Sequence, residues 1–230
     1  MLKVIQYPKV IIFDLDGVII DTAEFHFLAW KRLAEDLDIS IDRQFNEQLK
    51  GISRMESLER ILELSPTLEI SFEEKLRYAN QKNNHYLELV ESINSNYALP
   101  GIDNLIRKIA EQNIKIALGS ASKNALKVLD KLELTKYFDH VVDASKVKKG
   151  KPDPETFKTA ANFFNSPYSE CIGIEDAIAG VEAINKANMF SVGVGSLEHL
   201  SHADYLVGDT SDLIFEKIVK RYNEKKDHNK

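Results

Sequence analysis

The chain has 230 residues, of which 43% are hydrophobic and 29% charged, a composition typical of a globular protein with a substantial core. Thirty lysines and arginines against 36 acidic residues give a formal net charge of -6, which excludes a global positive field for nucleic acid or an anionic membrane. A single cysteine excludes an internal disulfide. Because the sequence shows neither a signal-like N-terminus nor a run of 18 apolar residues, we expect a cytoplasmic protein with no nucleic-acid and no membrane partner.

The first strong structural signal is the apolar run at residues 10–13, which ends at Asp14, Asp16 and Gly17. Four large apolar residues, three of them β-branched, predict a strand buried on both faces of a parallel sheet. In such sheets ligands bind at the carboxyl ends of the strands. Buried acids are costly unless a cation or protons compensate, so the segment predicts a Mg²⁺ site with one aspartate as nucleophile. The alternative is a strand followed by an Asp-rich turn.

The next block is entirely helical in pattern. Asp21 and Glu24 have capping-box spacing, and apolar residues recur at helical spacing as far as Leu37. Further helices are expected at residues 46–49, 53–64 and 72–93.

After Leu99-Pro100-Gly101, strands and helices alternate. Strands are expected at residues 114–118, 141–142, 171–174, 190–194 and 205–207. Helices are expected at residues 102–112, 123–132, 154–164, 177–187 and 211–222, with 223–230 a solvated tail. This alternation predicts a parallel sheet with right-handed crossovers.

The pattern therefore predicts an α/β fold: a Rossmann-like parallel-sheet core domain at residues 1–19 and 98–230, with an inserted all-helical cap domain at residues 20–97. Two linkers, near residues 19–22 and 97–101, begin beside the carboxylates. We expect the insert to cover or uncover the site as a lid.

Two further strand ends carry residues suited to anions. The strand expected at 114–118 leads into Ser120 and Ser122 before a helix N-terminus, which is either an anion site or a simple serine cap. Lys151, held against Pro152, is a phosphate candidate.

A third strand end is acidic. The strand expected at 171–174 runs into Glu175 and Asp176, which either favour the next helix through its dipole or join Asp14 and Asp16 in a Mg²⁺ site.

Taken together, Asp14-Leu15-Asp16-Gly17-Val18, the serines at 120 and 122, Lys151-Pro152 and Glu175-Asp176 resemble the four ordered motifs of the haloacid dehalogenase superfamily of phosphotransferases. The helical insert resembles the cap of that superfamily. Within it, the segment 50–54, His26, Trp30 and the segment 120–124 resemble the β-phosphoglucomutases.

A phosphoryl group needs an in-line nucleophile, a bridging cation and an acid for the leaving oxygen. Asp14 fits the nucleophile and Asp16 the general acid/base. Asp14, the Asp16 carbonyl, Asp176 and Glu175 would hold Mg²⁺. The resemblance implies that Ser120 and Lys151 take the phosphoryl oxygens, and that His26 supports the acid/base.

A mutase also needs a second phosphate site, for which Arg54 is our candidate, because its guanidinium suits bidentate phosphate binding. Each of these residues also has an alternative that involves no substrate. Arg54 and His26 could simply lie on the surface, Lys82 could be solvated, and Trp30 could serve only core packing. The full set of expected substrate-binding residues is Trp30, Lys50, Gly51, Ile52, Arg54, Lys82, Ser122, Lys123 and Asn124.

The resemblance thus implies a Mg²⁺-dependent enzyme that interconverts β-D-glucose 1-phosphate and D-glucose 6-phosphate through an aspartyl phosphate and β-D-glucose 1,6-bisphosphate. The alternatives are a capped sugar-phosphate phosphatase and a catalytically idle binding protein. Because cap motion needs free space, we expect a monomer.

Overall fold

A computed structural model describes residues 5–49 and 52–228. Six parallel strands form one sheet in these residues, in the order β3-β2-β1-β4-β5-β6. The strands are β1 (Val10–Phe13), β2 (Lys115–Leu118), β3 (His140–Val141), β4 (Cys171–Glu175), β5 (Phe190–Val194) and β6 (Tyr205–Val207). The expected strands are confirmed, each to within one residue at its ends.

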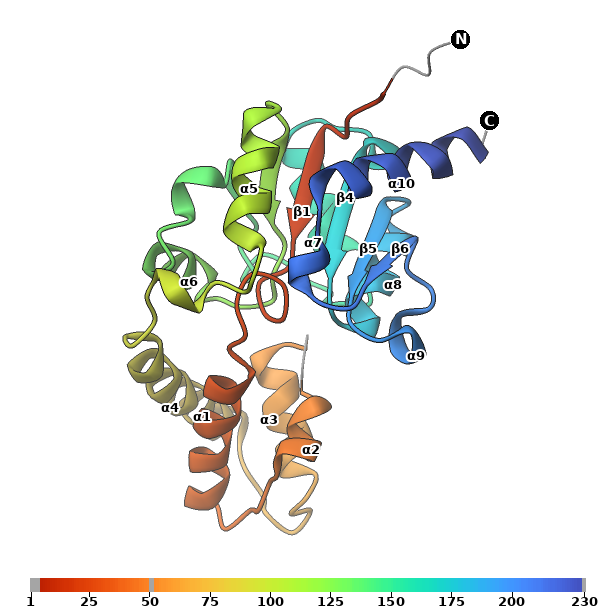
Figure 1. The fold of residues 1–230 in the computed structure, drawn as a ribbon. Helices are drawn as coiled ribbons and strands as arrows, with labels where there is room; N and C mark the ends of the chain where they lie inside the picture. Colours follow the sequence, from red (N-terminus) through yellow and green to blue (C-terminus); the bar gives the residue numbers. More distant parts are fainter. Residues whose placement is uncertain (1–4, 50–51, 229–230) are drawn as a thin grey trace.

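The central strand β1 is buried because hydrophobic residues point to both sides of it. Val10 and Ile12 pack on one face with helices α7 (Glu155–Phe163) and α8 (Ile178–Lys186). Ile11 and Phe13 pack on the other face with α5 (Ile102–Glu111), α6 (Ala125–Lys131) and α10 (Phe215–His228). Both hydrogen-bonding edges of β1 are also occupied, by β2 and β4. The result is a three-layer α/β core, with the short α9 (Leu197–Leu200) after β5 (Figure 1).

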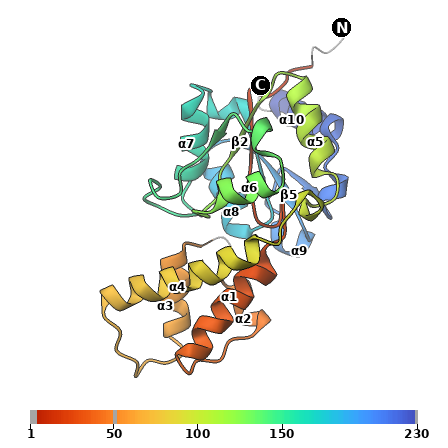
Figure 2. The ribbon, with the colours of Figure 1, turned by 90° about the vertical axis from the view of Figure 1, so that its left-hand side faces the viewer.

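The helices between β1 and α5 form a separate cluster, which we call the helical unit. We call the rest of the described chain the sheet unit. The helical unit consists of α1 (Ala23–Asp36), α2 (Arg43–Glu47), α3 (Arg54–Leu62) and α4 (Phe72–Val90). They surround their own hydrophobic core, with Trp30, Leu33, Leu58 and Ile61 at its centre. Figures 1 and 2 both show this unit standing off from the sheet. The expected division at residues 19/20 and 97/98 stays a prediction.

Two adjacent chain segments connect the units. Ile20 and Ala98 form an antiparallel bridge, and the Leu99 amide donates to the Ile19 carbonyl at 2.8 Å. The two linkers expected from the sequence therefore run side by side, directly after β1 and before α5.

Three sequence predictions about helix ends are wrong. The short helix expected at residues 46–49 is α2, which begins three residues earlier, at Arg43. Asp21 and Glu24 do not form a capping box: Thr22 is the N-cap of α1 without a side-chain cap bond, and the Asp21 carboxylate accepts from the Ala23 amide at 2.9 Å. The C-terminal helix starts at Phe215 rather than residue 211 and continues to His228, so most of the expected tail is helical.

Tertiary contacts explain the longer helix α10. The Asn223 side chain exchanges two 2.9 Å hydrogen bonds with the backbone of Gln6, and Lys225 pairs with Asp204 at 2.5 Å. Both partners lie far away in the sequence, so helical periodicity alone could not predict these last turns. None of the helices in the described ranges is both long and apolar enough to cross a membrane.

Candidate active site

A cleft of about 640 Å³ lies between the carboxyl edge of the sheet and the helical unit. Every site residue expected from the sequence that the structure describes lines this cleft. They are Asp14, Asp16, His26, Trp30, Ile52, Arg54, Lys82, Ser120, Ser122, Lys123, Asn124, Lys151, Glu175 and Asp176. Lys50 and Gly51, also expected to bind substrate, lie outside the described residues.

Three of the expected metal ligands converge at the ends of β1 and β4. Oxygen atoms of Asp14, Glu175 and Asp176 all lie within 4.8 Å of one another. The strands pair in register, with Phe13 beside Ile174, so the acids that follow them emerge side by side. The alternative in which Glu175 and Asp176 serve only the dipole of the next helix does not account for this convergence.

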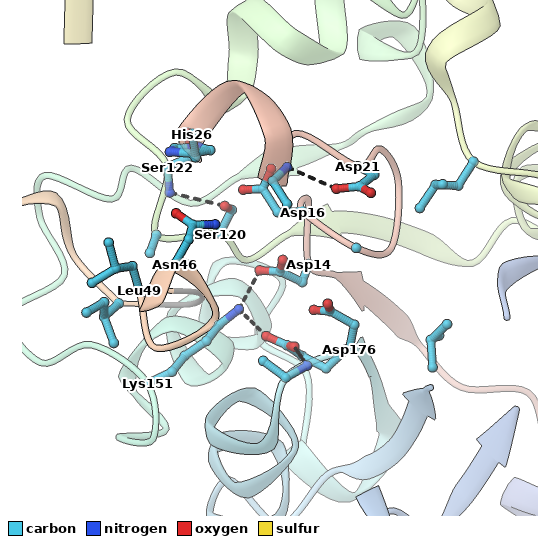
Figure 3. Close-up of a pocket in the computed structure, with 18 of the residues that line it drawn as sticks. Asp14, Asp16, Asp21, His26, Asn46, Leu49, Ser120, Ser122, Lys151 and Asp176 are labelled. Carbon is cyan, nitrogen blue, oxygen red and sulfur yellow. Dashed lines mark hydrogen bonds and ion pairs between the residues drawn. The ribbon is translucent and has the colours of Figure 1, made fainter. Parts of the chain in front are cut away.

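Among the residues that the structure describes, Lys151 supplies the ammonium group that contacts this cluster. Its Nζ lies 2.5 Å from Asp14 Oδ1 and 2.5 Å from Glu175 Oε1 (Figure 3). Burial acts to lower the pKa of Lys151, but the two carboxylates outweigh burial and raise it. Lys151 therefore stays protonated, which suits a residue that neutralises an anion.

The charge balance of the cluster fits a divalent cation. Burial raises the pKa of Asp14, although Lys151 opposes the rise, and burial with the neighbouring Glu175 and Asp14 carboxylates raises the pKa of Asp176 to about 8. The raised pKa values show that ionising these acids is costly, and the single ammonium of Lys151 cannot balance three carboxylates, so a divalent cation would supply the missing positive charge. Oxygen ligands without histidine or cysteine are those of a hard cation such as Mg²⁺ rather than zinc.

Two glycines make room for the acids. A Cβ atom on Gly17, whose φ is 77°, would lie 2.0 Å from Asp176 Oδ2. A Cβ atom on Gly180 would lie 1.9 Å from Glu175 Oε1. The tight turn at Gly17 was expected from the sequence, whereas the role of Gly180 was missed, because it depends on how α8 packs over β4.

Asp16 points away from the metal cluster toward the start of α1. Its carboxylate accepts a hydrogen bond from the Thr22 hydroxyl, a contact that the sequence analysis missed. Burial raises the pKa of Asp16, while Thr22 and Lys82 act to lower it. A raised pKa suits a carboxyl group that must carry a proton during part of a reaction cycle.

Two serines lie near the acids on the β2 side. Ser120 is buried, and its hydroxyl accepts from the Ser122 amide at 3.1 Å. Asn124 is the N-cap of α6, and the Ser122 hydroxyl accepts from its amide at 3.3 Å. Ser122 therefore contributes to the start of this helix, whereas the buried Ser120 does not.

The helical unit contributes cations to the opposite side of the cleft. Lys82 Nζ is buried, lies 2.8 Å from His26 Nδ1 and sits 4.6 Å from the centre of the Trp30 ring. Arg54 is half-buried. The alternative of a solvated Lys82 is wrong. Arg54 and His26, for which a surface position was the alternative, are partly buried and line the cleft, while Trp30 both packs in the core of the helical unit and lines the cleft.

The fold and this site define a class of phosphoryl-transfer enzyme with an aspartate on the central strand, and the comparisons agree. A family model described as haloacid dehalogenase-like hydrolase matches residues 8–188. The chain belongs to this family.

Two relatives span nearly the whole chain. A β-phosphoglucomutase of Bacillus subtilis is 46% identical over 217 residues, 94% of this chain and 96% of the relative. A crystal structure of a β-phosphoglucomutase from Clostridium difficile matches with a TM-score of 0.93 and 52% identity, covering 95% of this chain and 98% of the other. A phosphorylated carbohydrates phosphatase of Thermotoga maritima is more distant, 30% identical over 79% of this chain and 82% of its own length.

Proposed function

We propose that this chain catalyses the Mg²⁺-dependent interconversion of β-D-glucose 1-phosphate and D-glucose 6-phosphate, the activity of a β-phosphoglucomutase. The observation that carries the proposal is the pairing of an acidic phosphoryl-transfer site on the sheet unit with cations Arg54 and Lys82 on the facing helical unit. An intermediate with a phosphate at each end needs the acidic site for one phosphate and the cations of the helical unit for the other. The identities of 46% and 52% to β-phosphoglucomutases support the same activity.

Asp14 is the proposed nucleophile. With Asp14 phosphorylated, the 6-hydroxyl of β-D-glucose 1-phosphate attacks the phosphorus, Asp16 removes the hydroxyl proton, and the bond from phosphorus to the Asp14 oxygen breaks, which gives the bisphosphate. In the second half-reaction the Asp14 carboxylate oxygen attacks the phosphorus at the sugar 1-position, the bond from phosphorus to the leaving sugar oxygen breaks, and Asp16 delivers the proton to that oxygen. His26 supports this acid/base exchange from the helical unit.

Ser120 and Lys151 would bind the oxygens of the transferring phosphoryl group, where Lys151 is already held by Asp14. Asp14, Glu175, Asp176 and the Asp16 carbonyl would hold Mg²⁺. When bound, this ion would neutralise charge on the phosphoryl oxygens.

The distal phosphate would lie against Arg54. Ile52, Lys82 and Trp30 would contact the sugar from the helical unit, together with Lys50 and Gly51. Ser122, Lys123 and Asn124 would contact the substrate from the sheet unit, where they line the cleft. The intermediate would be β-D-glucose 1,6-bisphosphate, which must turn around between the two half-reactions.

The adjacent linkers at Ile20 and Ala98 support a cap domain, residues 20–97, that moves against a core of residues 1–19 and 98–230. Closure would exclude water, and this exclusion separates a mutase from a phosphatase. A cytoplasmic monomer is part of the same proposal.

The test supplies β-D-glucose 1-phosphate, Mg²⁺ and a trace of glucose 1,6-bisphosphate, and follows glucose 6-phosphate and free phosphate separately. Glucose 6-phosphate with little free phosphate, lost in Asp14→Asn, is the expected result. Free phosphate without glucose 6-phosphate would instead identify a sugar-phosphate phosphatase, as in the Thermotoga relative.

A further inference from the structure

A hydrogen-bonded group of three side chains crosses the cleft between the two units. Asn83, on α4, accepts from Arg54 Nη2 at 2.7 Å and from Asn124 Nδ2 at 2.8 Å, both at its Oδ1 atom. Arg54 begins α3 in the helical unit, whereas Asn124 precedes α6 in the sheet unit. All three side chains line the cleft.

Donor and acceptor chemistry fixes the orientation of these amides. A guanidinium group only donates hydrogen bonds, so the Asn83 atom that faces Arg54 is the oxygen. Asn124 must then present its NH₂ group to the same oxygen. One carbonyl oxygen, with two lone pairs, thus joins the cation of one unit to the amide of the other.

Asn83 orients Arg54 without cancelling its charge. No carboxylate forms an ion pair with Arg54 anywhere in residues 5–49 and 52–228. Burial lowers the pKa of Arg54, and Arg54 in turn contributes to lowering the pKa of Lys82. A neutral acceptor therefore leaves both positive charges directed at the cleft, where an aspartate at the same position would neutralise Arg54.

We propose that Asn83 is a positioning residue, which presents the Arg54 guanidinium to the distal phosphate and fastens the helical unit to the sheet unit through Asn124. This inference rests on the distal-phosphate role of Arg54 in the proposed function. Asn83 would contribute to substrate affinity, because it acts through Arg54 and not on the reacting atoms.

The experiment compares Asn83→Asp and Asn83→Leu with the wild type. The aspartate has nearly the same shape but carries a charge, whereas the leucine has similar size and no acceptor. Asn84→Asp is the matched control, since Asn84 is the next residue on the same helix and is exposed. Melting curves establish that each variant is folded.

We expect the KM for β-D-glucose 1-phosphate to rise about 10-fold in Asn83→Leu, the effect of losing one hydrogen bond to a charged group. It should rise about 100-fold in Asn83→Asp, where the phosphate must compete with a carboxylate for Arg54. The kcat should change much less than KM, and Asn84→Asp should match the wild type. A merely structural role predicts the reverse order, with the isosteric aspartate milder than leucine, and that result would overturn the inference.

A binding measurement separates this inference from the proposed function. Trp30 is the only tryptophan and lines the cleft, so its fluorescence can follow titration with glucose 6-phosphate without turnover. A wild type that forms no glucose 6-phosphate would refute the mutase, yet weaker sugar-phosphate binding by Asn83→Asp than by Asn83→Leu would still support Asn83. An active wild type with equal affinities in both variants would refute Asn83 alone.

Discussion

The Lys82 ammonium nitrogen lies 2.8 Å from Nδ1 of His26, and both side chains face the cleft from the helical unit. Burial lowers the pKa of both groups, to about 7 for Lys82 and well below its usual 6.5 for His26. Arg54 lowers the pKa of Lys82 further, while Asp16 opposes it. Since an ammonium group only donates, the neutral His26 accepts at Nδ1. The pair therefore carries at most one buried positive charge, on Lys82, and an anionic substrate in the cleft would favour that protonated form.

We expect Lys82→Met to stabilise the protein while reducing mutase activity. The pKa of Lys82 is 10.5 in the unfolded chain and about 7 in the folded protein, so the unfolded chain binds more protons between these values. The cost of the buried lysine is therefore full below pH 7 and falls as pH rises toward 10.5. Urea unfolding at pH 6 should show a gain of about 1 to 3 kcal/mol.

At pH 9.5 this gain should be smaller, because the lysine is then neutral in the folded protein but still mostly protonated in the unfolded chain, so most of the cost of burying its charge has gone. A gain that is equal at the two pH values would contradict the assignment of a lowered pKa to Lys82. Assays of glucose 6-phosphate formation on the same samples would show whether stability and activity change in opposite directions.

Mg²⁺ should stabilise the wild type more at pH 9 than at pH 6. The pKa of Asp176 is raised to about 8 in the metal-free protein, so this acid adds stability at low pH that is lost as pH rises through 8. Protons and Mg²⁺ compete for the Asp176 carboxylate, so Mg²⁺ binds more tightly at high pH. At 100 times its dissociation constant, Mg²⁺ should add about 2.7 kcal/mol to the free energy of unfolding.

Asp176→Asn should lose most of this response and, without metal, be more stable than the wild type at pH 9. Melting curves with EDTA or with Mg²⁺ measure both effects. Asp130→Asn, a change of an exposed acid on α6, is the control that should respond to Mg²⁺ like the wild type. An unchanged Mg²⁺ response in Asp176→Asn would remove Asp176 from the metal site.

Gly180→Ala should be much more harmful than Gly150→Ala. A Cβ atom on Gly180 would lie 1.9 Å from Oε1 of the buried Glu175, which Lys151 holds in place, whereas one on Gly150 meets nothing within 4 Å. Overpacking of this kind costs about 1 to 3 kcal/mol. Displacing Glu175 and Lys151 by about 1 Å should also lower kcat about 100-fold.

Gly150→Ala should change the free energy of unfolding by less than about 0.5 kcal/mol, as exposed substitutions do. Denaturant unfolding and steady-state kinetics on both variants provide the comparison. Full activity in Gly180→Ala would show that Glu175 is free to move without consequence for phosphoryl transfer.

Thr22→Val should move the ascending limb of the pH–rate profile to higher pH. The Thr22 hydroxyl hydrogen-bonds the Asp16 carboxylate and acts to lower its pKa. Without this bond the pKa of Asp16 rises, so less of it is ionised as a base at low pH. We expect about a 10-fold lower kcat/KM at pH 6, and recovery in Thr22→Ser, which keeps the hydroxyl. Equal profiles for valine and serine would disprove the assignment.

The sequence determined the sheet and the residues at its carboxyl edge. The apolar run before Asp14 and the strand before Glu175 are local signals, and parallel strands must end at the same edge. Convergence of these acids follows from that geometry alone. The places of Ser120 and Lys151 beside them were expected from the family resemblance, since Lys151 lies in a loop ten residues after the end of β3.

Tertiary structure alone decided the contacts between segments that share no local pattern. Asn83 meets Arg54 and Asn124 across the cleft, and Gly180 makes room for Glu175 only because α8 packs over β4. The last turns of α10 likewise depend on Gln6, at the other end of the chain. Periodicity reports which face of an element is buried, but not which distant side chain it meets, because that choice is made by packing of the whole chain.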